Sequence, residues 1–147
     1  MRIVAVLSLS ACGAAYAAAQ VPFQVCRDRQ DRLVTGVVDN TVTYAGLATY
    51  QQGRPVIIWN ANSNRHLSDT EQIYIYLHEC AHHRLGHLEQ ARKTARWDDD
   101  ARWEVEADCW AIQLMVDGGM IKGRHLAQLE RSRRTVRGDA THLGGET

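Results

Sequence analysis

The chain has 147 residues, of which 45% are hydrophobic and 23% are charged, as is ordinary for a single globular domain. Its 17 basic and 17 acidic residues give a formal net charge of zero. This balance argues against nucleic acid or an anionic membrane surface as the main partner, because those partners usually require a basic excess.

The N-terminus has the pattern of a cleavable secretory signal peptide over residues 1–19. Arg2 precedes an apolar run from Ile3 to Leu9, and small residues then lead to a cleavage site after Ala17 or Ala19. The run is shorter than the roughly 20 residues of a membrane-spanning helix. We therefore expect an exported protein, periplasmic or secreted in a bacterium, without a transmembrane segment.

A second interpretation of the N-terminus stays open. The four residues that end at Cys12 resemble a bacterial lipobox, in which this cysteine would carry a lipid anchor. The apolar run before it is short for that purpose, so we favour cleavage. The expected organisation is a signal peptide at 1–19, one domain at 20–137 and a flexible tail at 138–147.

Short β-rich stretches precede the first long helix. Leu33–Val38 and Thr41–Tyr44 flank Asp39-Asn40, a turn-favouring pair, and so predict a hairpin. Gly53-Arg54-Pro55 marks a second turn before Val56–Trp59, the strongest strand pattern in the chain. The last strand is either a purely structural core strand or an edge strand that also pairs with an extended peptide.

A helix is predicted between Ser68 and Gly86. Ser68 and Glu71 have the spacing of a capping box, and the glycine supplies a stop. Leu77 and Ala81 recur at helical spacing, which predicts a buried side.

This helix contains an HExxH motif formed by His78, Glu79 and His82. Residues four apart lie on one face of a helix, so the two histidines can bind one Zn²⁺ ion while Glu79 lies beside it as a general base. Catalytic zinc sites generally use three protein ligands, so another residue must complete the site.

A second amphipathic helix is predicted after Asp98–Asp100 and before Gly118-Gly119. The acidic run is expected to cap this helix, with calcium binding as the alternative. Glu104 and Asp108 share one face by their four-residue spacing. Glu104 could be the third zinc ligand, and Asp108 could accept a hydrogen bond from the far nitrogen of a ligand histidine.

With these motifs the chain resembles the gluzincin metallopeptidases, whose HExxH helix is followed by a helix bearing ExxxD. The Glu-x-x-Ala-Asp form is similar to the M48-like and neutral zinc metallopeptidase branches, and the resemblance covers about Val56 to Val116. It implies a minimal zincin-like α+β domain that hydrolyses peptide bonds. It also implies roles for five residues: zinc ligands His78, His82 and Glu104, general base Glu79, and Asp108 as support for a histidine.

Other assignments stay open. His87, Glu106 and Cys109 are alternative metal ligands, whereas His83 is expected to be a surface or packing residue. The metzincin pattern HExxHxxGxxH is not matched, because leucines stand at the positions of its glycine and third histidine.

The chemistry also leaves a second class open, a secreted zinc-binding or peptide-binding protein with this fold and little or no turnover. No residue stands out as the donor that would stabilise a transition state. The candidates are His87, His125, His142, Tyr74 and Tyr76.

Three cysteines follow the signal peptide: Cys26, Cys80 and Cys109. An exported protein can keep a disulfide, and Cys80 and Cys109 lie on the two predicted helices. We predict a bridge between these two, with Cys26 as the alternative partner of either. A short third helix is predicted around Leu126, and the sequence does not set an oligomeric state.

Overall fold

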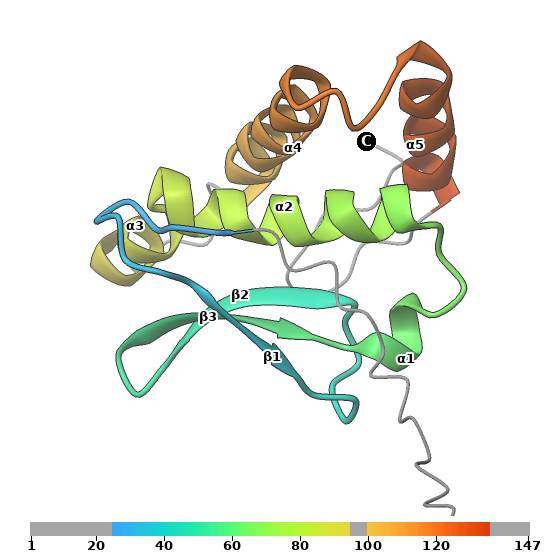
Figure 1. The fold of residues 1–147 in the computed structure, drawn as a ribbon. Helices are drawn as coiled ribbons and strands as arrows, with labels where there is room; N and C mark the ends of the chain where they lie inside the picture. Colours follow the sequence, from blue (N-terminus) through green and yellow to red (C-terminus); the bar gives the residue numbers. More distant parts are fainter. Residues whose placement is uncertain (1–24, 95–99, 136–147) are drawn as a thin grey trace, which may run out of the picture.

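The computed structural model describes residues 25–94 and 100–135 (Figure 1). These residues form three strands and five helices in the order β1 (Thr35–Val38), β2 (Gly46–Gln51), β3 (Arg54–Trp59), α1 (Ala61–Asn64), α2 (Asp69–Leu85), α3 (His87–Thr94), α4 (Asp100–Asp117) and α5 (Gly123–Thr135). The α+β class is confirmed, as is the order of a small sheet, the HExxH helix α2, the ExxxD helix α4 and a C-terminal helix α5.

Several expectations fall outside the described residues. They concern the signal peptide, Cys12, the tail, His142 and Asp98-Asp99. Within the two described ranges, no helix has the length and apolar character that a membrane crossing requires.

The sheet has the strand order β1-β3-β2, with β3 in the centre. β1 runs parallel to β3, with Thr35 opposite Val56, and β2 runs antiparallel to it, with Gln51 opposite Arg54. The predicted hairpin between Leu33–Val38 and Thr41–Tyr44 is therefore wrong. The hairpin of this sheet joins β2 to β3, as the second predicted turn requires.

Local turn chemistry explains that error. The Asp39 carboxylate accepts hydrogen bonds from both the backbone N–H and the hydroxyl of Thr41, so the chain turns instead of extending into a partner strand. Gln52 and Gly53 both have positive φ, 51° and 75°, which suits the tight turn between β2 and β3. Both edges of β3 are paired, so Val56–Trp59 is a core strand and β2 is an edge strand.

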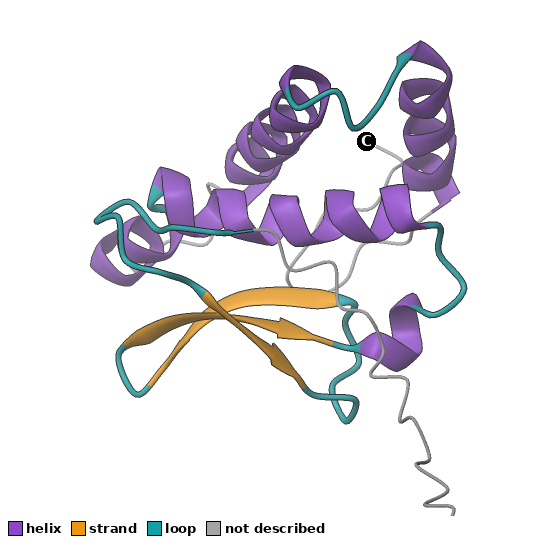
Figure 2. Cartoon of the chain, viewed as in Figure 1, coloured by secondary structure: helices purple, strands orange, loops and turns teal. Residues whose placement is uncertain are grey.

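The elements form three layers, as Figures 1 and 2 show. The sheet lies on one side of α2, and α4 and α5 lie on the other. Most of the second half of α2 is buried, because this helix contacts neighbours on both sides. The hydrophobic core comprises Cys26, Val34, Ile57, Trp59, Tyr74, Tyr76, Leu77, Cys80, Ala111, Met115, Ile121 and Leu129.

Both ends of α2 have the signals that the sequence predicts. The Ser68 hydroxyl accepts from the Glu71 N–H, and the Glu71 carboxylate accepts from the Ser68 N–H at 2.9 Å. This capping box satisfies amides that the first turn leaves without partners. Gly86 ends the helix in the left-handed conformation, with φ 78°, and α3 starts at the next residue.

A disulfide joins Cys26 to Cys80, and Cys109 is an exposed free thiol. The predicted Cys80–Cys109 bridge is wrong, and the alternative partner Cys26 is the one found. The reason is rotational: successive helical residues lie about 100° apart. Because Asp108 points toward α2, Cys109 is turned away from that helix. The bridge ties the N-terminal loop, where Arg27 pairs with Leu33, to the middle of α2.

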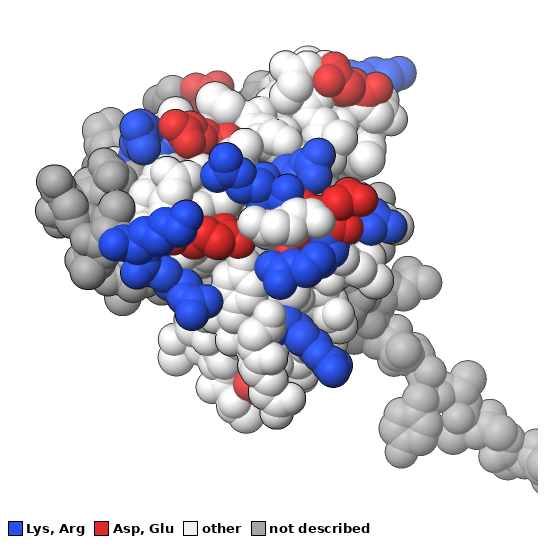
Figure 3. Space-filling model, turned by 90° about the vertical axis from the view of Figure 1, so that its left-hand side faces the viewer, with Lys and Arg blue, Asp and Glu red and all other residues white. Residues whose placement is uncertain are grey.

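Charges of both signs lie side by side on the face shown in Figure 3. The N-terminal loop lies on this side of the molecule (Figure 1) and contains two ion pairs, Arg32–Asp28 at 2.7 Å and Arg27–Asp31 at 3.8 Å. The Asp28 side chain is buried and also accepts from the Gln30 and Arg32 amides. These bonds stabilise the loop that carries Cys26.

The disulfide generates a stability prediction. It spans 54 residues, and removal of a cross-link of that loop length should lower the free energy of unfolding by about 2–4 kcal/mol. Urea unfolding of Cys26→Ala, followed by circular dichroism, measures this loss. The control Cys109→Ala should stay within about 0.5 kcal/mol of the wild type. Equal stability of the two variants would contradict the prediction.

Candidate metal centre

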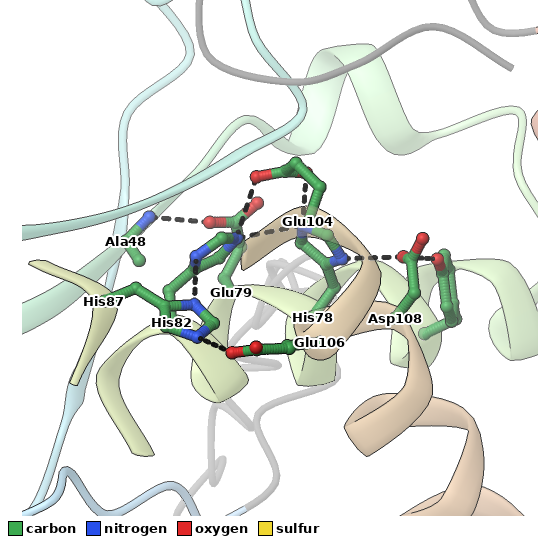
Figure 4. A network of polar contacts seen from close by, with 9 residues as sticks. Ala48, His78, Glu79, His82, His87, Glu104, Glu106 and Asp108 are labelled. Carbon is green, nitrogen blue, oxygen red and sulfur yellow. Dashed lines mark hydrogen bonds and ion pairs between the residues drawn. The ribbon is translucent and has the colours of Figure 1, made fainter. Parts of the chain in front are cut away.

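Three buried side chains converge between α2 and α4: His78 and His82 from α2, and Glu104 from α4 (Figure 4). The Nε2 atoms of the two histidines are 3.1 Å apart. Glu104 reaches both, with Oε2 3.1 Å from His78 Nε2 and Oε1 3.2 Å from His82 Nε2. Among the described residues this is the group of histidines, cysteines and acids that could hold a metal ion.

The donor set fits a small divalent cation. Ligand bonds of about 2.0–2.1 Å at tetrahedral angles place two ligand atoms about 3.3 Å apart. The three separations of 3.1–3.2 Å are close to that value. Two imidazoles and one carboxylate therefore already lie on one face of such a coordination sphere, and the structure brings together the three predicted ligands.

Asp108 lies where the sequence predicts a support for a histidine. Its Oδ1 accepts a hydrogen bond from His78 Nδ1 at 2.9 Å and another from the Tyr74 hydroxyl. Because a carboxylate only accepts, the hydrogen of His78 is held on Nδ1. In the neutral ring this leaves the Nε2 lone pair pointing at the converging group.

The neighbouring carboxylates also shift the pKa of His78, and the histidines shift that of Glu104. Burial by itself would lower the pKa of His78, but hydrogen bonds to Asp108 and Glu104 outweigh it and raise that pKa to about 10. Burial would raise the pKa of Glu104, yet its bonds to His78 and His82 bring that pKa well below its usual value. Without metal, His78 is therefore an imidazolium paired with an ionised Glu104.

Glu79 lies next to this group and is held from the sheet. Its Oε2 accepts the backbone N–H of Ala48 at 2.7 Å (Figure 4). Gly46 allows this approach: a Cβ there would lie 3.0 Å from Glu79 Cγ and 3.3 Å from Ile75 Cγ2. The contact between β2 and α2 fixes the orientation of the carboxylate.

The alternative ligands lie elsewhere. His87 is buried, but its Nδ1 faces His82 Nδ1, the nitrogen on the opposite side from Glu104. Glu106 contacts His87, and Cys109 is exposed. His83 is a packing residue, since it is fully buried with Nε2 2.9 Å from the Val56 carbonyl, and burial lowers its pKa.

The residues that the sequence offers as donors to a transition state mostly make other contacts. Tyr74 hydrogen-bonds Asp108, and Tyr76 belongs to the hydrophobic core. His125, on α5, accepts a hydrogen bond at Nδ1 from the backbone amide of Lys122, the residue before this helix. Sequence reasoning missed Ala48, because a backbone amide reveals nothing through its residue type. Gly46 before a β-rich stretch was the available signal for a close approach of backbone to side chain.

The fold and site thus define a small α+β protein whose HExxH helix and a second helix form a potential metal site. In the comparison with protein families, peptidase U49 matches residues 72–135, a range that runs from α2 into α5 and contains all three converging residues. This similarity supports a peptidase, a hydrolase acting on peptide substrates. The comparisons with curated proteins and with solved structures gave no match.

Replacing Glu104 should weaken metal binding strongly. Glu104→Ala removes the only carboxylate of the converging group. The loss of zinc affinity should exceed the about 10–100-fold typical for loss of an outer hydrogen-bond partner. Competition with a chromophoric chelator measures the affinity. The exposed Glu130 on α5 provides the control Glu130→Ala, and equal affinities of the two variants would refute the assignment.

Metal binding should also release protons. Because the raised pKa keeps His78 protonated at pH 7, a metal must displace about one proton, and affinity should rise about tenfold per pH unit near neutrality. Affinity rises with pH because the metal and a proton compete for His78, and a lower pH favours the protonated imidazolium. Calorimetry in two buffers of different ionisation enthalpy counts the protons. A binding enthalpy independent of the buffer would contradict this prediction.

Proposed function

We propose that this chain is an exported, zinc-dependent metallopeptidase of the gluzincin type. The observation that carries the proposal is the convergence of His78, His82 and Glu104 within 3.1–3.2 Å beside Glu79. The peptidase U49 match over α2 and α4 supports the peptidase part of the proposal.

Zinc is the metal that the donor chemistry supports best. Two histidines and one glutamate are a ligand set of catalytic zinc, which keeps a further position for water or substrate. The same donor types hold iron(II) in oxygenases. The carboxylate of Glu79 next to the site and the similarity to a peptidase support hydrolysis instead.

Each residue then has a role. Zinc bound here would lower the pKa of bound water to about 7, far below that of bulk water, and would polarise the peptide carbonyl. The Glu79 carboxylate would accept a proton from the attacking water and would donate it to the leaving amine. The Ala48 N–H, 2.7 Å from Glu79, holds the carboxylate in place, and Asp108 does the same for His78.

The edge strand β2 is the element we propose for substrate binding. Within the described sheet it pairs with β3 alone, and the Ala48 N–H points away from β3 toward Glu79. An extended peptide can add to such an edge through main-chain hydrogen bonds. This would bring its scissile bond beside Glu79 and the converging ligands.

Export is supported by two features. Residues 1–19 have the pattern of a signal peptide, and disulfides such as Cys26–Cys80 persist in oxidising compartments. We propose a periplasmic or secreted protein, with a lipoprotein anchored through Cys12 as the alternative.

One observation favours a second candidate function, a secreted zinc- or peptide-binding protein with little turnover. Of the donor candidates within the described residues, Tyr74 and His87 already hydrogen-bond side chains around the ligands, and Tyr76 lies in the core. The site would then bind without stabilising a transition state.

The variant Glu79→Gln tests whether the protein is a metallopeptidase or only binds zinc or peptide. We expect this variant to keep zinc and to lose about 10²–10⁴-fold in turnover, because an amide cannot act as a general base. Mass spectrometry of a diverse peptide mixture, incubated with zinc-loaded mature protein, measures cleavage. Glu130→Gln, at an exposed position of α5, is the matched control, and a chelated sample tests metal dependence.

Cuts made by the wild type and the control, but neither by Glu79→Gln nor after chelation, would establish the metallopeptidase. Full activity in Glu79→Gln would refute the mechanism. If zinc binds and no peptide is cut, the second function is the correct one.

A further inference from the structure

A chain of buried contacts leads from His82 to the surface on the side away from Glu104. His82 Nδ1 is 3.1 Å from His87 Nδ1, and His87 Nε2 is 3.1 Å from Glu106 Oε2. Figure 4 shows the three side chains in a row, with Ala48 and Glu79 on the other side of His82. His87 lies outside both motifs, and Glu106 occupies an unspecified position of the ExxxD motif.

When His87 is neutral, the donors and acceptors in this row have one consistent arrangement. The Glu106 carboxylate only accepts, so His87 Nε2 donates to it. A neutral His87 then has its lone pair on Nδ1, which accepts a hydrogen from His82 Nδ1. His82 is thereby left with its lone pair on Nε2, the atom that faces Glu104 and His78. The row selects the tautomer of His82 that can bind a metal.

The fold holds this row rigidly. His87 is the first residue of α3, directly after Gly86, whose left-handed conformation turns the chain back toward His82. Its side chain is 2% exposed, and its ring stacks on Trp103, with 5.6 Å between centroids and 15° between planes. This stacking leaves the imidazole few alternative orientations.

Helix α4 is connected to both nitrogens of His82, to one directly and to the other through His87. Glu104 reaches Nε2 directly, and Glu106 reaches Nδ1 through His87. Because residues two apart on a helix point in widely different directions, one turn of α4 can supply both contacts. The Glu106 side chain is about half exposed, and its Oε1 lies 3.6 Å from Arg102 Nε.

We propose that His87 and Glu106 are positioning residues that fix the tautomer and ring orientation of His82 for metal binding. This inference rests on the metal site of the proposed function. It gives His82 the kind of support that Asp108 gives His78, with an imidazole inserted between ligand and carboxylate. Loss of such outer partners typically lowers metal affinity about 10–100-fold.

The test uses His87→Phe, which keeps an aromatic ring for Trp103 and removes both nitrogens. Zinc affinity, measured by chelator competition, should fall about 10–100-fold, and the visible absorption spectrum of the Co²⁺-substituted protein should change. His87→Asn should recover part of the affinity, because its amide oxygen can accept the hydrogen of His82 Nδ1. His66→Phe, at an exposed histidine, is the matched control.

Glu106→Ala gives a second, independent variant. It leaves the core unchanged and should weaken zinc binding in the same direction, whereas Glu106→Gln, which keeps an acceptor for His87 Nε2, should recover most of it. If His87→Phe does not fold, as circular dichroism would show, the comparison of these two variants decides the proposal.

The outcomes separate this inference from the proposed function. Wild-type affinity and an unchanged Co²⁺ spectrum in folded His87→Phe would overturn the positioning role and leave the metallopeptidase intact. A spectrum of the wild type that requires His87 as a direct ligand would also overturn it. Failure of the wild-type protein to bind zinc would overturn both.

Discussion

The contact between α2 and α4 is the constraint on which the rest of the structure depends. It places two imidazoles and two carboxylates, those of His78, His82, Glu104 and Asp108, where each residue is only 6–8% exposed. Buried charges are costly unless they are paired. Here the pairs lie 2.9–3.2 Å apart, and His78 Nε2, which carries a proton when no metal is bound, is one of the atoms that could hold a cation.

Three elements and a disulfide contact the HExxH turn of α2. β2 contacts it through the Ala48 amide, α4 through its carboxylates, and α3 through His87. Cys80, inside the motif, joins it to the N-terminal loop. Side chains that are fixed by packing and by outer hydrogen bonds keep the precise geometry that metal binding requires. The surrounding fold therefore contributes to the site as directly as the motif does.

The peptidase similarity covers only part of this arrangement. The matched residues 72–135 include all the candidate ligands, whereas β2, which supplies the contact to Glu79, lies before them. The proposed substrate edge thus comes from the part of the chain that the similarity does not reach. It is supported by the sheet topology and by the Ala48–Glu79 bond.

Much of the fold and the site could be predicted because the signals are local. Helix α2, its capping box and its stop at Gly86 depend on residues within a few positions of one another. The spacing from His78 to His82, and from Glu104 to Asp108, places each pair on one helical face whatever surrounds it. By itself, the sequence determined which residues share a face and which chemistry they can perform.

Tertiary structure decided which faces meet. Any two strands of similar pattern can pair, so the parallel pairing of β1 with β3 could not be predicted from the sequence. The partner of Cys80 depended on the rotation of α4 and the path of the N-terminal loop. The roles proposed for Ala48 and His87 likewise depend on contacts between separate elements. Sequence patterns report local geometry, whereas these contacts arise only when distant segments pack together.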